Sequence, residues 1–300
     1  MNPLRLAALV TLVLFSPCNS GLFAAEGFPG NIRVIKAKGN VEHIDNTSKA
    51  SAPLVEGEFV KQNHSVKTGA ASTAILLFSN GSTVVIRPNS VFSMESFTQV
   101  PFDAASVQYK GLSKEPSVSQ TKVSVKEGTV IASVAKLQKG STMNISTPVG
   151  IAGIRGTIVQ VSITRPGGGP QRVNISVPEG SVAFTALNGT TTTLSDGSTL
   201  TMSEAAPEAQ PTQLTPQEAA EIEALINEAL AQLPPEGAFD GVPDGSPETG
   251  GIGDAGEGQA GGFGGDQGAG DVGTAPGGGS SGGGGSATPT PIPTPNPPVS

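Results

Sequence analysis

Residues 73–86 read TAILLFSNGSTVVI, and this stretch decides the fold class of the chain. Two runs of mainly apolar, strand-forming residues, Thr73–Phe78 and Thr83–Ile86, flank the dipeptide Asn80-Gly81. Asn-Gly between such runs is a strong hairpin signal, because a type I′ turn requires a positive φ at both of its central residues. The stretch therefore predicts an antiparallel hairpin that is closed by a type I′ turn.

Strand signals of the same kind extend outward from this hairpin in both directions. Val159, Val161 and Ile163 alternate with polar residues, as in a strand that buries one face. Further tight turns are predicted at Asn188-Gly189 and Asp196-Gly197. We therefore expect residues 31–202 to form one all-β domain, either a multi-stranded antiparallel sandwich or an irregular β-roll.

Short sequence echoes run through this predicted domain. The tripeptide Gly-x-Val recurs at Gly39, Gly128 and Gly180, and a glutamate precedes the last two. The residues around Asn80-Gly81 are echoed around Asp196-Gly197. The spacings are irregular, so they do not establish a solenoid. Repeated strand–turn–strand units within a sandwich or a roll explain the echoes equally well.

Charge divides the chain into two parts of opposite sign. All 17 Lys and Arg residues lie at or before Arg172, together with 9 acidic residues, which gives this part a net charge of +8. Residues 173–300 contain 16 acidic residues and no basic residue. The pattern predicts a mildly basic folded part that is followed by an acidic part of different character.

The two ends of the chain have compositions that are not typical of a folded domain. Arg5 and the short apolar run after it are typical of a signal peptide, which we place at residues 1–25. Cys18 is the only cysteine, and Pro17 before it disfavours a lipoprotein. Residues 236–300 are acidic and rich in Gly and Pro, which predicts a disordered tail. We expect an exported protein, periplasmic or extracellular, without a transmembrane span.

Residues 215–233 predict one amphipathic helix. Thr215 is the expected N-cap, Pro216 suits the first helical position, and Glu218 completes a capping box. The apolar residues that fall on one face are Ile222, Leu225, Ile226, Ala229, Leu230 and Leu233. We expect this face to dock on the β domain, because an isolated helix of this length is marginal in water. The alternative is that it binds a partner or a second copy of the chain.

The residues that usually carry chemistry are scarce. His43 and His64 lack further ligands at metal-binding spacing, and the carboxylates of the β domain are scattered. We therefore expect no catalytic, cofactor-binding or metal-binding residues. Nucleic-acid binding is also disfavoured, because Tyr109 is the only tyrosine and tryptophan is absent, which removes the usual stacking platforms.

The densest motif spans residues 147–157 and reads TPVGIAGIRGT. Its key residues are Thr147, Pro148, Gly153, Arg155, Gly156 and Thr157. The flanking glycines predict a tight corner between two strands. The guanidinium of Arg155 could satisfy loop carbonyls, or it could bind a carboxylate or a phosphate. Because its neighbours are apolar, we expect the first, with Arg155 in a buried structural role.

Five motifs of this chain resemble the FecR domain and occur in the same order. They are residues 67–74, 80–84, 87–90, 127–130 and 147–157. The resemblance covers most of residues 31–202. It implies the fold of the periplasmic sensing part of iron-siderophore transport regulators. Regulators of that kind carry a cytoplasmic anti-sigma segment and a membrane helix before the domain, where this chain has the predicted signal peptide.

Together these patterns predict a non-enzymatic FecR-like β module at the cell envelope. The expected partner is an envelope protein or a surface polymer, and the expected role is structural or adhesive. The alternative is an envelope signalling or sensing module that works with a membrane-anchored partner. The resemblance favours the alternative, whereas the predicted lack of a membrane span favours the structural role.

Overall fold

The computed structural model describes residues 27–206 and 209–240. The predicted signal peptide and residues 241–300 of the predicted tail lie outside the described residues. Of the described residues, 49% are in strands and 9% are helical, which confirms the predicted all-β class. No helix in the described ranges is both long and apolar enough to cross a membrane.

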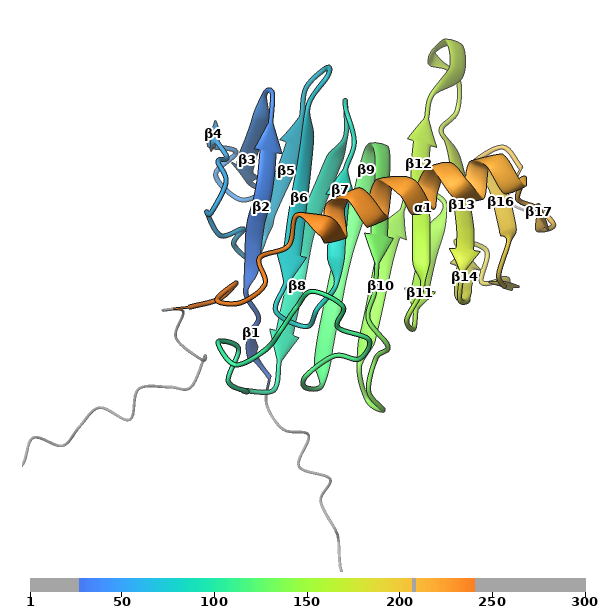
Figure 1. The fold of residues 1–300 in the computed structure, drawn as a ribbon. Helices are drawn as coiled ribbons and strands as arrows, with labels where there is room; N and C mark the ends of the chain where they lie inside the picture. Colours follow the sequence, from blue (N-terminus) through green and yellow to red (C-terminus); the bar gives the residue numbers. More distant parts are fainter. Residues whose placement is uncertain (1–26, 207–208, 241–300) are drawn as a thin grey trace, which may run out of the picture. The chain divides into compact units, whose positions relative to one another are not determined.

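The strands form two facing layers that share one long strand (Figure 1). The first sheet has the order β4 (Ser51–Pro53), β3 (Val41–Asp45), β5 (His64–Thr68), β8 (Val91–Gln99), β9 (Ser119–Ser133), β10 (Thr142–Thr147), β11 (Gly150–Ile154), β14 (Val182–Ala186) and β15 (Thr191–Leu194). The short β1 (Phe28–Pro29) also pairs with β8. Among these pairings only β9 with β10 is parallel.

The second sheet shares β9 with the first. Its order is β2 (Ile32–Lys38), β6 (Thr73–Phe78), β7 (Thr83–Ile86), β9, β12 (Ile158–Thr164), β13 (Arg172–Glu179), β16 (Ser198–Ser203) and β17 (Thr212–Gln213), all antiparallel. A 3-10 turn, Pro166–Gly168, lies between β12 and β13. The first part of β9 pairs with β8 and β10, and its last part pairs with β7 and β12. The two layers are therefore one continuous hydrogen-bonded ladder.

The main core lies between the two layers. The alternating residues Val159, Val161 and Ile163 of β12 all point into it, as their pattern predicted. Its largest fully buried side chains include Phe78, Phe92, Phe97, Phe184, Met94 and Met143. Burying each such side chain contributes roughly 1.5–3 kcal/mol, so this core is the main source of stability.

The Gly-x-Val echoes mark places where the chain passes from one sheet to the other. Gly39 joins β2 to β3, Gly128 lies within β9 where that strand changes sheets, and Gly180 joins β13 to β14. All three have a positive φ, between +79° and +94°. Glycine adopts this conformation at no steric cost, unlike residues with a Cβ. The echoes thus reflect repeated corners of an irregular roll.

The hairpin predicted at residues 73–86 is present, but its turn differs from the prediction. Strands β6 and β7 pair in the expected antiparallel register. Gly81 has a φ of +87°, whereas Asn80 does not have a positive φ, so the type I′ prediction is wrong. The fully buried Asn80 side chain accepts a hydrogen bond from the Ser82 N–H at 3.0 Å and donates one to Ser119 Oγ at 3.1 Å. The turn thus places the Asn80 side chain in a tertiary contact with Ser119, which the local sequence does not predict.

Helix α1 (Pro216–Ala231) lies across the outer face of the second sheet (Figure 1). Its capping box is present, since the Thr215 hydroxyl and the Glu218 side chain each bond the other residue's backbone N–H. The hydrogen bonds from Thr215 lower the pKa of the Glu218 carboxyl. The buried apolar face contacts Ile75, Val85 and Ile131 of the sheet. The predicted helix and its docking are confirmed, and this face is not available for self-association while the helix is docked.

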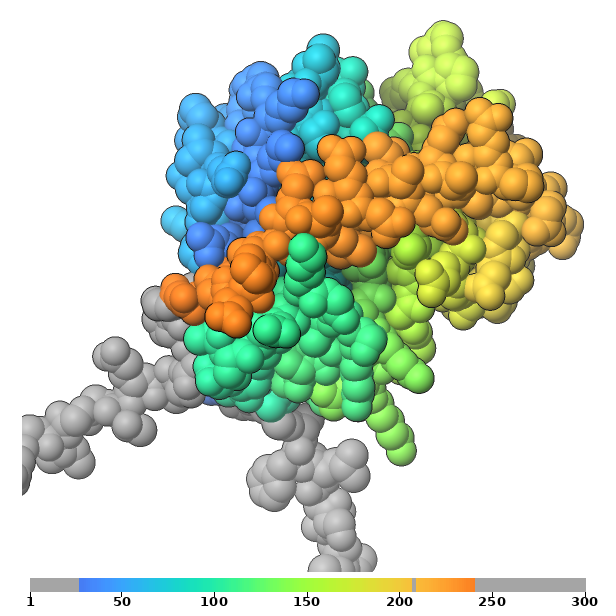
Figure 2. Space-filling view, viewed as in Figure 1, coloured from blue at the N-terminus to red at the C-terminus, as the bar shows by residue number. Residues whose placement is uncertain are grey.

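The segment after α1 also packs on the domain. Phe239 is buried, and its ring lies 5.1 Å from that of Tyr109, measured between centroids. The Arg33 guanidinium donates a hydrogen bond to the Ala238 carbonyl at 2.6 Å. The first residues of the predicted tail, 236–240, are therefore part of the folded structure. Figure 2 shows this segment against the loop formed by residues 100–118.

Candidate functional site

A groove lies at a corner where the chain changes sheets. We call it the corner groove. Helix α1 and three segments of the chain line it. The segments are residues 109–113, residues 133–136 at the end of β9 and just after it, and residues 155–158 from the end of β11 to the start of β12. Its volume is about 510 Å³. It collects half of the predicted key residues, namely Arg155, Gly156 and Thr157.

One wall of the corner groove is formed by the loop of residues 100–118, which runs beside the chain that leaves β9. The Lys136 N–H donates to the Ser113 carbonyl at 3.0 Å, and the Glu115 N–H donates to the Lys136 carbonyl at 3.1 Å. These bonds form an isolated parallel bridge that pairs Lys114 with Lys136. Two lysines that are 22 positions apart in sequence are thus held side by side.

A buried carboxylate anchors this loop. Glu115 is only 2% exposed, and its carboxylate accepts hydrogen bonds from the Ser119 hydroxyl at 2.7 Å, from the Gln138 N–H at 2.5 Å and from the Ser141 hydroxyl. Burying a charged group is costly unless it is hydrogen-bonded in this way. Glu115 was not among the predicted site residues, because nothing in the neighbouring sequence predicts its burial.

The hydroxyl of Tyr109 also fixes the loop to the domain. It is buried and donates a hydrogen bond to the Ser79 carbonyl at 3.1 Å. Burial, with a smaller contribution from the charge of Asp103, raises the pKa of Tyr109 well above its usual value. The phenol therefore stays protonated and remains a donor at all physiological pH values.

The predicted motif is divided between the two ends of a hairpin. Arg155, Gly156 and Thr157 line the corner groove, whereas Thr147 and Pro148 lie at the opposite end of the β10–β11 hairpin. There the Thr147 hydroxyl donates to the Gly150 carbonyl at 2.9 Å and closes the turn. Gly153 lies within β11, between β10 and β14. The motif is a run of structural positions, of which only the last three contribute to the groove.

The expected burial of Arg155 is wrong. Its side chain is exposed, and its guanidinium reaches only the Ser141 carbonyl, at the long distance of 3.5 Å. Ile154 at the end of β11 is buried in the core, whereas Arg155, which follows it between the two strands, is exposed. A weak single hydrogen bond leaves most of its five donors free to bind an anion.

Gly156 and Thr157 form the inner wall of the corner. Gly156 has a φ of +88°, and a Cβ added to it would lie 3.0 Å from the Lys136 Cα. Thr157 is 4% exposed, and its hydroxyl has no hydrogen-bond partner among the described residues. Gly156 thus permits the close approach of Lys136 to the corner. Thr157 places a buried hydroxyl without a hydrogen-bond partner beside it.

Replacing Gly156 by alanine is expected to lower the free energy of unfolding by about 1–3 kcal/mol, from left-handed strain and crowding against Lys136. The matched control is Gly153→Ala, because Gly153 is extended and a Cβ there would meet its nearest atoms at an ordinary 3.6 Å. Urea unfolding of both variants, followed by circular dichroism, measures the difference. Equal stability of the two variants would contradict the structural role of Gly156.

Basic groups dominate the electrostatics of the corner groove. Lys136 and Arg155 line it, and Lys114 is held beside Lys136. Glu179 is the acidic residue among the lining residues. Leu112 and Leu230 provide half-buried apolar surface between these groups. The arrangement suits binding of an anionic group with an adjoining apolar part, and it contains no pair of groups suited to acid–base or nucleophilic chemistry.

The histidines lie elsewhere. His43 and His64 belong to the neighbouring strands β3 and β5, and their ring centroids are 6.0 Å apart. The His64 Nδ1 lies 2.9 Å from the Gln62 carbonyl oxygen. Within the described ranges, no group of three or more His, Cys, Asp or Glu side chains is close enough to hold a metal ion.

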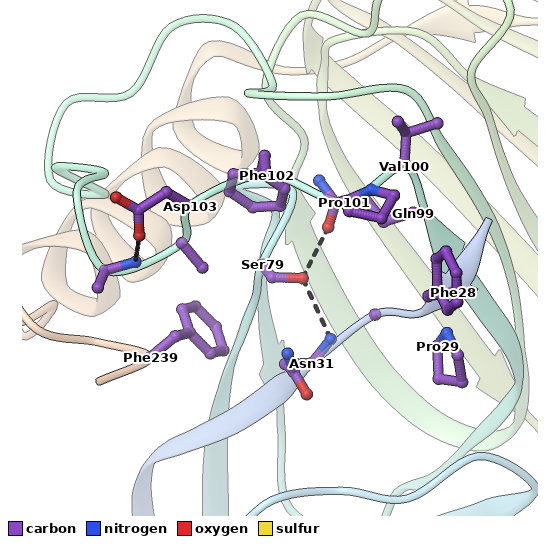
Figure 3. Close-up of a pocket in the computed structure, with 13 residues that line it drawn as sticks. Phe28, Pro29, Asn31, Ser79, Gln99, Val100, Pro101, Phe102, Asp103 and Phe239 are labelled. Atoms are coloured by element: carbon purple, nitrogen blue, oxygen red, sulfur yellow. Dashed lines mark hydrogen bonds between the residues drawn. The ribbon is translucent and has the colours of Figure 1, made fainter. Parts of the chain in front are cut away.

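A second cavity, of about 270 Å³, lies where β1 and the segment after α1 meet the start of the 100–118 loop (Figure 3). Phe28, Phe102 and Phe239 line it. At its floor the Ser79 hydroxyl accepts from the Asn31 N–H at 3.1 Å and donates to Gln99 Oε1 at 2.7 Å (Figure 3). The Gln99 Nε2 has no hydrogen-bond partner among the described residues, and the cavity contains none of the predicted motif residues.

One family model matches part of the chain. The family model described as FecR protein matches residues 64–183, from β5 into β14, and this range includes the corner between β11 and β12. No curated protein matches the sequence.

Two crystal structures of a candidate anti-sigma factor from Parabacteroides distasonis are similar to the chain. Both are 12% identical, with TM-scores of 0.40 and 0.39. The matches cover 54% and 55% of this chain, and 64% and 71% of the matched chains. The chain thus spans slightly less than two thirds of the first of them.

Proposed function

We propose, on the premise that residues 64–183 form a FecR domain, that this protein is an exported signalling module of the cell envelope. It acts by binding a partner protein and catalyses no reaction. The family match is the observation that carries this proposal, because FecR domains are periplasmic sensing domains of a regulatory, non-enzymatic kind. The signal-peptide pattern at residues 1–25 supports the same compartment.

This proposal replaces the structural or adhesive role that we expected from the sequence. No observation supports adhesion, whereas the FecR domain supports signalling. Among the described residues, the large exposed apolar side chains lie in two places: Val55 and Phe59 in the connection after β4, and Ile151 of β11 with Leu187, which follows the paired strand β14. Such small groups of apolar residues are ordinary on a protein surface and do not indicate a large adhesive patch.

In the proposed mechanism the two-layer domain is a rigid scaffold that presents a binding surface to its partner. Its strands are locked by one continuous ladder, and its corners are held by glycines in conformations that suit few other residues. Sensing then consists of binding and release of the partner, which is a membrane-anchored protein that passes the signal on. A rigid surface favours such binding because little conformational entropy is lost.

The test is deletion of the gene in its native host, with transcripts measured in the deletion strain and after complementation. We expect a defined set of transcripts to change and the wild-type chain to restore them. A chain with Leu12→Arg and Leu14→Arg, which disrupts the apolar run of the signal peptide, should fail to restore them. Unchanged transcripts together with loss of surface attachment would contradict signalling and favour the structural role.

A further inference from the structure

We infer that the corner groove binds an acidic, extended peptide segment of the partner protein. This inference rests on the proposed function, because it names the chemistry of the partner that the signalling module recognises. Three features of the groove carry it: an excess of positive charge held together by the fold, half-buried apolar side chains in its lining, and an exposed amide on helix α1.

Backbone pairing brings the positively charged residues together. Lys114 and Lys136 are paired across the parallel bridge, which places two like charges side by side on exposed positions. Like charges in paired positions destabilise a sheet. Arg155 adds a third charge, and Gly156 allows the corner to approach Lys136 closely. A binding partner of opposite charge would relieve this repulsion.

The acidic groups nearby do not cancel this charge. The Glu115 carboxylate is adjacent to Lys114 in sequence, but it is buried and accepts hydrogen bonds from Ser119, Gln138 and Ser141. Glu179 lines the groove and offsets one of the three basic groups. The groove therefore keeps an excess of positive charge that suits an anionic ligand.

The apolar and polar lining argues for a peptide rather than a free anion. Leu112 and Leu230 line the groove and offer surface for one apolar side chain. Asn227 of α1 lines the groove as well and presents an exposed amide. An acidic peptide with an apolar residue can use all of these groups, whereas a small anion would use only the charges.

The test uses the full chain and a fluorescein-labelled peptide of the sequence Glu-Asp-Glu-Leu-Glu-Asp-Glu, followed by fluorescence anisotropy. We expect saturable binding that weakens as salt is added, and little binding of the analogue with Gln and Asn in place of Glu and Asp. The double variant Lys114→Gln/Lys136→Gln should weaken binding at least about tenfold, because it removes two charges at the contact.

The matched control is Lys122→Gln/Lys126→Gln, which removes the same charge from exposed positions of β9 that do not line the groove. It should change affinity by less than about twofold, because only distant charges are removed. Melting temperatures of both double variants check that they fold. Equal loss of binding in the two would overturn the inference, since it would reveal non-specific attraction. Failure of the wild-type chain to bind would overturn it too.

Two further outcomes separate this inference from the proposed function. If the groove variant loses peptide binding and still restores every transcript in the deletion strain, the groove is not the partner site and signalling stands. If the deletion changes no transcript while peptide binding depends on the groove, the signalling function is wrong and the inference about the groove is supported. Binding that appears only after Asp244, Glu248, Asp254 and Glu257 are neutralised would assign the groove to the chain's own acidic part and overturn the partner assignment.

Discussion

Replacing Gly128 by alanine is expected to lower the free energy of unfolding by about 2–5 kcal/mol, the sum of left-handed strain and overpacking. Gly128 has a φ of +79° and lies where β9 passes from the first sheet to the second. A Cβ there would lie 2.5 Å from the Asn89 carbonyl oxygen and would also collide with the Ser90 side chain. Because β9 belongs to both layers, a shift at this point disturbs both sheets.

Gly140→Ala is the matched control for this change. Gly140 has a similar φ of +97°, but the nearest atom to its added Cβ is 3.8 Å away. It should therefore cost only the backbone strain, about 1–2 kcal/mol. Chemical unfolding of the two variants separates crowding from strain. If the two variants lost the same stability, crowding against residues 89 and 90 would not contribute to the effect of Gly128→Ala.

Replacing Glu115 by alanine is expected to lower the free energy of unfolding by about 3–5 kcal/mol, as when one partner of a buried charged network is removed. The change leaves the Ser119 and Ser141 hydroxyls and the Gln138 N–H without their shared acceptor. It also releases the loop that holds Lys114 beside Lys136. Thermal unfolding measures the loss of stability, and the peptide assay above should show weaker binding at temperatures where the variant is folded.

Glu95→Ala is the control for Glu115→Ala, because Glu95 is an exposed carboxylate on strand β8, which pairs with β9. Its removal should change stability by less than about 0.5 kcal/mol, as is usual for surface substitutions. Glu115→Gln should fall between the two alanine variants, since its amide oxygen can still accept hydrogen bonds. A Glu115→Ala variant as stable as Glu95→Ala would mean that the buried network does not hold the loop.

Local sequence predicted the elements whose conformation depends on neighbouring residues. The hairpin at residues 73–86, the alternation of β12 and the capping box of α1 are all present in the structure. The Gly-x-Val echoes are present as corners, because a positive φ is a local requirement that glycine meets. The type I′ prediction was wrong for the opposite reason: the buried side chain of Asn80 bonds to Ser119, which is far away in sequence.

The corner groove, by contrast, was decided by the tertiary structure. The sequence marked Arg155, Gly156 and Thr157 as one motif, but it could not show that Arg155 points outward or that Thr147 lies at the far end of a hairpin. The pairing of Lys114 with Lys136 depends on a loop that the buried Glu115 anchors. By itself the sequence determined the all-β class and the amphipathic helix, because those follow from local periodicity and backbone preference. Which charges meet at the groove depends on contacts between residues distant in sequence, and only the packed fold brings these together.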